Sequence, residues 1–198
     1  PPSVNSFVEL ANTTSDDQAS KAIKLNFSLI AEELKELGIS VNCAPVLDIT
    51  VDGADPIIGD RALGNDLGLI KKMGEAICEG LLSRRVFPVI KHIPGHGRAL
   101  LDSHSAVPIV DTKLEDLMET DFEAFRIFNH LPLAMTAHVI FSDIDESNPA
   151  TVSRKVIKEI VRDYMGYDGL LISDDLSMQA LSGNIKERTE NAIEAGCD

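Results

Sequence analysis

The sequence of 198 residues has no tryptophan and few aromatic, basic or cysteine residues. Lysine and arginine together number 18 against 32 acidic residues, which gives a formal charge of −14. Binding to nucleic acid needs clustered basic side chains that contact phosphates, so we expect no nucleic-acid partner. No run approaches the roughly 18 uncharged apolar residues of a membrane span, so we expect no membrane association.

The three cysteines, Cys43, Cys78 and Cys197, are odd in number, far apart in sequence and free of any Cys-x-x-Cys pair. This pattern favours reduced, buried thiols in a cytoplasmic protein over a disulfide framework or a zinc site. The chain begins Pro-Pro-Ser, without the basic and apolar segments of a secretory signal peptide. We therefore predict a cytoplasmic location.

What the sequence does contain is an alternation of helix and strand patterns. The predicted strands are short and apolar on both faces, as in a parallel sheet that helices cover, and the alternation indicates an α/β fold. Helices are predicted over residues 15–37, 66–85, 113–128, 153–165 and 185–195, and strands over residues 39–47, 86–92, 131–138 and 169–173.

Reactive side chains stand where these strands end: Asp48, Lys91 with His92, His138 and Asp174. A (β/α)8 barrel gathers all its strand ends around one site, whereas an open sheet gathers only those near its switch point. The pattern therefore favours a (β/α)8 TIM-barrel type. About four of the eight βα units are visible, so residues 1–198 are predicted to be a partial barrel domain. Its exposed sheet edges would favour self-association.

The segment Lys-His-Ile-Pro-Gly-His-Gly at residues 91–97, followed by Asp102 and His104, is the richest in reactive groups. An aspartate bonded to one imidazole nitrogen fixes the tautomer of the ring and leaves the other nitrogen to exchange a proton. The simpler interpretation is a loop turn with a surface histidine. The glycines suggest a mobile loop over a strand end.

Two further segments add a carboxylate and a cation. Asp174 follows an apolar strand and could act as a nucleophile toward an anomeric carbon, although capping of the next turn would also explain Asp174 and Asp175. Arg61 could bind a polar substrate group through its forked donors, or could pair with Asp60 or Asp66. A carboxylate nucleophile and a buffered proton donor are the minimum for retaining glycoside hydrolysis.

The run KHIPGHG followed by LLDSH closely resembles the signature of the β-N-acetylhexosaminidases of glycoside hydrolase family 3. The run ISDDLSM resembles the nucleophile segment of that family, and APVLDI and IGDRALGND resemble its preceding strand and arginine loop. The resemblance implies a barrel enzyme that removes terminal β-linked N-acetylglucosamine with retention of configuration and without a cofactor or metal.

The resemblance also implies roles for individual residues and a substrate. The substrate would be an N-acetylglucosamine-containing saccharide or muropeptide, which implies peptidoglycan recycling in the cytoplasm. By position in the motifs, Asp174 matches the nucleophile, His104 the general acid/base and Asp102 its partner, while Lys91, His92 and Arg61 match residues that hold the sugar.

Two alternatives stay open at this point. In the family the barrel begins before Pro1 and continues after Asp198, so the chain could be an inactive remnant that keeps the shape of the site. A metal-dependent TIM-barrel hydrolase is the other alternative, because His92, His96 and the pair Asp102 and His104 offer ligands that zinc accepts.

Overall fold

The computed structural model describes residues 1–100 and 107–198, and its strands run parallel in chain order. Strand β1 (Val41–Asn42) pairs with β2 (Phe87–Pro88), and β3 (Ile90–Ile93) pairs with β5 (Leu133–Thr136), which pairs with β7 (Leu170–Ile172). A bridge from Val46 to Lys91 continues the first pairing toward β3. Among the described strands the order does not reverse, as it would at the switch point of a doubly wound sheet, which is the order expected of a barrel.

Three helices begin at capping signals that the sequence carries. Helix α2 (Asp16–Glu36) begins at Ser15, whose side chain accepts a hydrogen bond from the Gln18 amide. Helix α3 (Leu67–Leu82) begins at Asp66, which accepts from the Leu69 amide. Helix α6 (Ile185–Ala195) opens with a capping box of Asn184 and Glu187. Side-chain caps satisfy amide groups that have no partner within the helix.

Two predicted helices take a different form. The one expected over 113–128 is split into α4 (Leu114–Glu119) and α5 (Asp121–Arg126). The hydroxyl of Thr120 bonds back to the carbonyl of Asp116, 2.6 Å away, which competes with the regular helical ladder. The one expected over 153–165 is a π-helix, η3 (Val156–Tyr164).

The sequence patterns did not predict several smaller elements. Helix α1 (Val4–Thr13) precedes α2, and β4 (Ile109–Val110) pairs in parallel with β6 (Ile140–Phe141). Two short 3₁₀ turns, η1 (Gly59–Arg61) and η2 (Ala150–Val152), lie in the loops after β1 and β6. The two strands and the 3₁₀ turns are too short for a pattern of apolar residues to reveal them, whereas α1 has ten residues and was overlooked.

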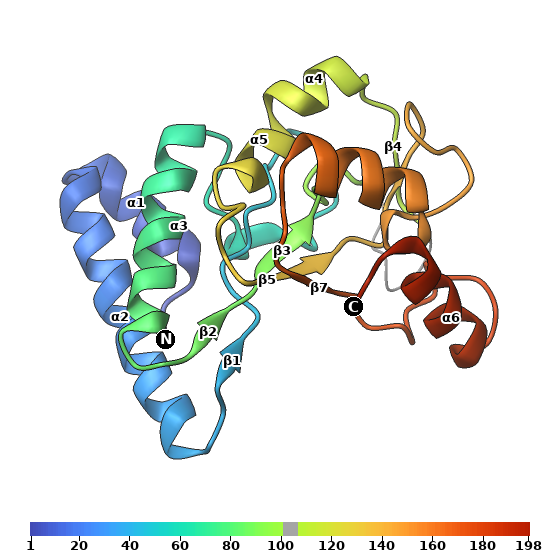
Figure 1. Ribbon diagram of the computed structural model, residues 1–198. Helices are drawn as coiled ribbons and strands as arrows, with labels where there is room; N and C mark the ends of the chain where they lie inside the picture. The colour runs from blue at the N-terminus through green and yellow to red at the C-terminus, as the bar shows by residue number, and fades with distance from the viewer. Residues whose placement is uncertain (101–106) are drawn as a thin grey trace.

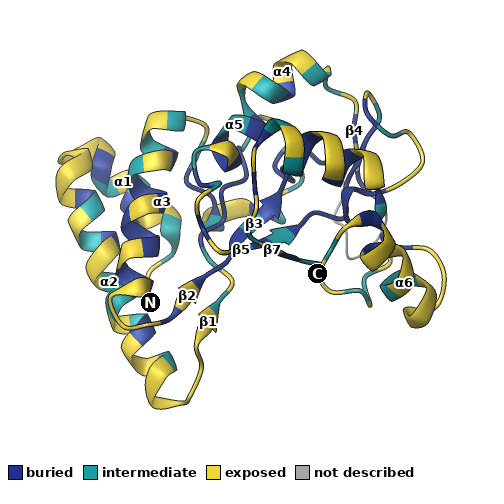
Figure 2. Ribbon diagram, in the orientation of Figure 1, coloured by how far each residue is buried: buried dark blue, intermediate teal, exposed yellow. Residues whose placement is uncertain are grey.

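Helices α1, α2 and α3 gather on one side of the strands, and α6 lies at the opposite end beside the C-terminus (Figure 1). Helices α2 and α3 approach closely because Gly80 has no side chain: a Cβ there would lie 2.6 Å from the Lys24 carbonyl oxygen. The faces that these helices turn toward their neighbours are buried, and their outer faces are exposed (Figure 2).

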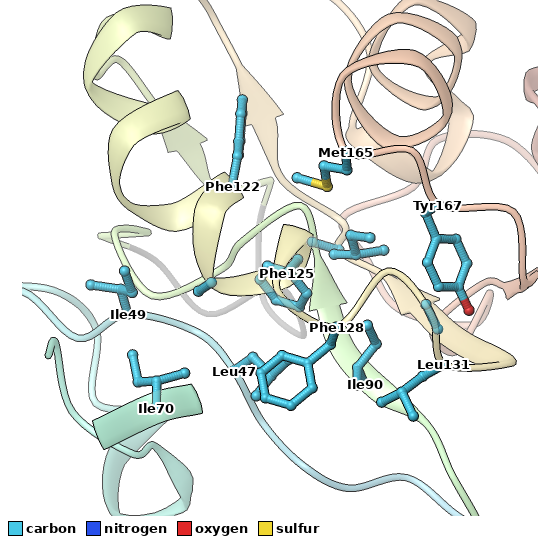
Figure 3. Packing of buried hydrophobic residues seen from close by; sticks show 14 of the residues in the cluster. Leu47, Ile49, Ile70, Ile90, Phe122, Phe125, Phe128, Leu131, Met165 and Tyr167 are labelled. Carbon is cyan, nitrogen blue, oxygen red and sulfur yellow. The ribbon is translucent and has the colours of Figure 1, made fainter. Parts of the chain in front are cut away.

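The main core lies between the strands and the helices that cover them (Figure 3). Leu47 and Ile90 come from strand segments, and Phe128 follows α5; all three are at most 1% exposed. Gly74 in α3 makes room for the Phe128 ring, because a Cβ there would lie 2.6 Å from the ring. This packing fixes the strand segments whose ends carry the reactive side chains.

The three cysteines are free thiols. Cys78 is buried, as predicted, whereas Cys197 is half-buried and Cys43 is exposed, so the prediction of buried thiols was wrong for Cys43. Burial raises the pKa of the Cys78 thiol to about 12, so this thiol stays protonated at neutral pH. None of the helices in the described ranges is both long and apolar enough to cross a membrane.

Candidate active site

The predicted sugar-binding and nucleophilic residues that the structure describes share one cavity of about 180 Å³ at the carboxyl ends of the strands. They reach it from the loop after β1, from β3 and from the segment after β7. A larger cavity of about 450 Å³ lies against α6 and contains none of the predicted site residues. The smaller cavity is therefore the candidate active site. The smaller cavity is lined by Ile57, Ile58, Arg61, Lys91, His92, His96, Asp174 and Met178.

Asp48 lies beneath this cavity, is fully buried, and holds two segments of the site together. Its carboxylate lies 2.6 Å from His92 Nδ1 and accepts the His96 backbone amide at 2.7 Å and the His92 amide at 3.3 Å. Burial by itself raises the pKa of Asp48. The charges and hydrogen bonds of His92 and His96 outweigh burial and hold that pKa below its usual value. An ionised carboxylate can only accept, so Nδ1 of His92 carries a proton.

With Nδ1 held by Asp48, Nε2 of His92 faces the carboxylate of Asp174. The two atoms are 3.8 Å apart, which is beyond a direct hydrogen bond and leaves an electrostatic interaction. His92 is 5% exposed. The sequence left open whether His92 is a satisfied core histidine or a site residue; one ring nitrogen is satisfied in the core and the other faces the cavity.

Asp174 follows β7 and presents one oxygen to the cavity. Its Oδ1 accepts the amide of Asp175 at 2.8 Å, and its Oδ2 is the atom that faces His92. The side chain is 20% exposed, so a small ligand can reach it. Asp175 has the capping role that the sequence suggested, because its carboxylate accepts the Ser177 amide at 2.8 Å. Of the two neighbouring aspartates, Asp174 is the one that lines the cavity.

Two cationic side chains complete the lining. Nε of Arg61 donates to the Ile58 carbonyl at 3.3 Å, and Nη2 donates to the Ile57 carbonyl. Within the described ranges Arg61 forms no ion pair with Asp60 or Asp66, so the structural role considered from sequence is not seen. The backbone of Lys91 bonds on both sides, to Pro45 and Leu47, which fixes the direction of its side chain.

The glycines of the segment 91–97 serve close packing. A Cβ on Gly97 would lie 1.9 Å from the Ile49 carbonyl oxygen, and Gly95 has φ +148° beside Asp121. Nε of Arg98 donates to the Asp121 carboxylate at 2.6 Å, which ties the segment to α5. Mobility was the reason inferred from sequence for these glycines. The reason in the structure is space and backbone conformation, because Gly95 and Gly97 are both buried.

The other predicted catalytic residues, Asp102 and His104, lie outside the described residues, so their roles stay predictions. Sequence reasoning missed the role of Asp48 in the site, although its place at the end of an apolar strand was the available signal.

No group of three or more His, Cys, Asp or Glu side chains is placed to hold a metal ion in residues 1–100 and 107–198. Of the ligands considered for a metal-dependent hydrolase, His92 uses Nδ1 to bond Asp48.

Residues 3–198 match the family model described as "Glycosyl hydrolase family 3 N terminal domain". The chain belongs to glycosyl hydrolase family 3. This confirms the family inferred from the motifs around Asp174 and the segment 91–97. It also agrees with the α/β fold of TIM-barrel type, of which the parallel strands in chain order are part.

Curated relatives named "Beta-hexosaminidase" match most of this family 3 chain. The protein from Thiobacillus denitrificans is 38% identical over 174 residues, which are 86% of this chain and 48% of that protein. The protein from Idiomarina loihiensis is 36% identical over 200 residues, covering 100% of this chain and 59% of that protein. The chain thus spans about half to three fifths of the length of these relatives.

Solved structures of related enzymes superpose closely on this chain. NagZ from Neisseria gonorrhoeae, in complex with N-trifluoroacetyl-D-glucosamine, has a TM-score of 0.91 at 32% identity and covers 100% of this chain and 57% of that one. A family 3 β-N-acetylglucosaminidase from Paenibacillus sp. has a TM-score of 0.86 at 35% identity and covers 90% of this chain and 35% of that one.

Proposed function

We propose that the protein hydrolyses terminal β-linked N-acetylglucosamine with retention of configuration, and that Asp174 is the nucleophile. The observation that carries this proposal is the convergence of Asp174, His92, Lys91 and Arg61 on one cavity from three separate segments. The names of the relatives and the sugar bound to the Neisseria gonorrhoeae enzyme support the substrate class. Residues 1–198 are then part of one N-terminal barrel domain.

The first step forms a covalent bond between Asp174 and the sugar. Oδ1 of Asp174 is engaged by the Asp175 amide, so Oδ2 attacks the anomeric carbon. The bond between that carbon and the glycosidic oxygen breaks, and the leaving oxygen takes a proton from His104, whose imidazolium Asp102 stabilises. These two roles rest on the family motif alone.

The second step releases the sugar. A water molecule attacks the anomeric carbon, His104 takes its proton, and the bond to Asp174 breaks, which restores the carboxylate. Two inversions at one carbon give net retention.

Cations and donors around Asp174 would hold the sugar. Lys91 and Arg61 can donate to hydroxyl and acetamido oxygens. His92 cannot rotate freely, because Asp48 holds Nδ1, so Nε2 presents a fixed polar atom to the ligand. Such preorganised contacts stabilise charge that develops in the transition state without reorganisation at the moment of reaction.

We extend the proposal to a cytoplasmic role in peptidoglycan recycling, with a muropeptide as the natural substrate. The support is the family motif and the solved NagZ relatives. Self-association through exposed strand edges is also proposed. The outer edge of β1 pairs with no other described strand. At the outer edge of β7, Asp198 already bonds the amide and the carbonyl of Leu171, so β1 is the edge that we propose. Light scattering at several protein concentrations tests it, and a constant monomer mass would contradict it.

Hydrolysis of p-nitrophenyl N-acetyl-β-glucosaminide by the wild-type protein and by Asp174→Asn tests the function. Asp168→Asn is the matched control, because Asp168 is an exposed carboxylate that precedes the same strand. We expect turnover in the wild type and the control, and a loss of at least about 1,000-fold in Asp174→Asn. A folded wild type without turnover would overturn the proposal and support the inactive remnant. Turnover that a chelator abolishes would support the metal-dependent alternative.

A further inference from the structure

His138 is a buried histidine that the proposed mechanism does not use, yet it contacts the segment that carries Asp174. It follows β5 and is 1% exposed. Its Nε2 lies 3.1 Å from the backbone carbonyl oxygen of Asp175, and its Nδ1 lies 2.7 Å from the hydroxyl of Thr151. A carbonyl oxygen only accepts hydrogen bonds, so Nε2 must carry the proton and donate.

The other side of the ring is set by two threonine hydroxyls. Burial lowers the pKa of His138, so the ring is neutral at pH 7 and its Nδ1 is an acceptor. The Thr151 hydroxyl then donates to Nδ1, and the Thr136 hydroxyl, 2.7 Å away, donates to Thr151. The Thr151 hydroxyl also lies 3.0 Å from the Ala137 carbonyl oxygen, which accepts the Thr151 amide as well. A hydroxyl has a single proton, and the neutral ring needs that proton at Nδ1. This arrangement leaves one consistent proton assignment, with Nε2 as the donor.

The bond from His138 fixes the residue that orients the nucleophile. The amide of Asp175 donates to Oδ1 of Asp174, and the carbonyl of the same residue accepts from His138. The two groups belong to adjacent peptide units that meet at the Asp175 Cα, so a shift of the Asp175 backbone would disturb both bonds and move the Asp174 carboxylate. Nη1 of Arg188 from α6 holds the rest of the segment through the carbonyls of Leu176 and Met178.

We propose that His138 is a positioning residue for Asp174: as a neutral donor it holds the Asp175 carbonyl and thereby sets the direction of the Asp174 carboxylate. The proposal rests on the proposed role of Asp174 as nucleophile. A displacement near 1 Å of a reacting group can cost on the order of 100-fold in rate, so loss of this bond should reduce turnover by about that factor.

A pair of substitutions separates positioning from general structural support. The amide nitrogen of glutamine stands as many bonds from Cβ as Nε2 of histidine, so His138→Gln can keep the donor. In His138→Asn the amide reaches only the place of Nδ1. We expect His138→Asn to lower kcat by roughly 10- to 100-fold with KM nearly unchanged, and His138→Gln to recover most of that loss. Equal losses of kcat in both variants, in proportion to the loss of folded protein, would overturn the proposal.

A second measurement works without turnover. Nitrogen-detected NMR of the wild-type protein labelled with ¹⁵N-histidine should show His138 neutral and protonated at Nε2. A crystal structure of His138→Asn should show the Asp174 carboxylate turned away from the Asp175 amide. A proton at Nδ1, or an unmoved carboxylate, would overturn the positioning role. If the wild type had no turnover, the proposed function would fail, and these two observations would still decide the role of His138.

Discussion

Asp48 offers the most informative single change, because one buried carboxylate supports two histidine segments. In the wild type the His96 backbone amide lies 2.7 Å from Oδ1 of Asp48. In Asp48→Asn the side-chain oxygen of asparagine can still accept this bond. The new NH₂ group then faces Nδ1 of His92, where Oδ2 lies at 2.6 Å in the wild type. Two donors cannot bond, so His92 has to move its proton from Nδ1 to Nε2.

The cost follows from the bonds that change. A hydrogen bond to a charged group contributes about 1.5–3 kcal/mol and a neutral one about 0.5–1.5 kcal/mol, a difference of about 1 kcal/mol. The variant makes both short bonds of Asp48 neutral, those with His92 Nδ1 and with the His96 amide. We expect a loss near 2 kcal/mol, which for a chain of this size lowers Tm by roughly 4–8 °C. The larger effect is chemical: a protonated Nε2 would face Asp174 Oδ2 and compete with the ligand for that oxygen.

Thermal unfolding and ¹⁵N NMR of the histidines would measure both effects. Asp66→Asn is the matched control, since Asp66 caps α3 through one bond to the Leu69 amide and asparagine caps equally well. An Asp48→Asn protein with unchanged Tm and with His92 still protonated at Nδ1 would refute the reasoning.

Two further predictions concern packing and pH. Gly97→Ala places a Cβ 1.9 Å from the Ile49 carbonyl oxygen, so urea unfolding should show a free energy of unfolding lower by about 3 kcal/mol or more. Gly68→Ala is the control, because the nearest atom to its Cβ is a side-chain oxygen at 3.1 Å. Equal losses of unfolding free energy in the two variants would contradict the steric explanation. Burial lowers the pKa of His96 and His138, so the unfolded chain takes up protons at higher pH than the folded one. Stability should therefore fall as pH drops below about 6.5, by at most about 1.4 kcal/mol per pH unit for each histidine, and urea unfolding with equal stability at pH 7.5 and 5.5 would contradict this.

The sequence was sufficient where local signals decide the structure. The helices predicted from residues 15 and 66 begin at the caps of α2 and α3. The predicted strand ranges overlap β1, β2, β3, β5 and β7, which are shorter than the apolar runs. Because parallel strands bring their carboxyl ends to one side, motifs far apart in the chain could be assigned to one site. Lys91, His92 and Asp174 do line one cavity.

What the sequence could not show depends on contacts between distant residues. Asp48 bonds His92 across 44 positions, and His138 bonds Asp175 across 37, so no local pattern marks either pair. The break at Thr120 was also missed, because the apolar period continues through it while the hydroxyl bonds back to the Asp116 carbonyl.

Identification of the covalent intermediate tests the central claim most directly. A fluorinated N-acetylglucosaminide with a good leaving group should form a glycosyl-enzyme that hydrolyses slowly enough for mass spectrometry. We predict one sugar per chain, carried by the peptide that contains Asp174 and absent in Asp174→Asn. Turnover without a labelled peptide, or a label on a carboxylate other than Asp174, would contradict the account.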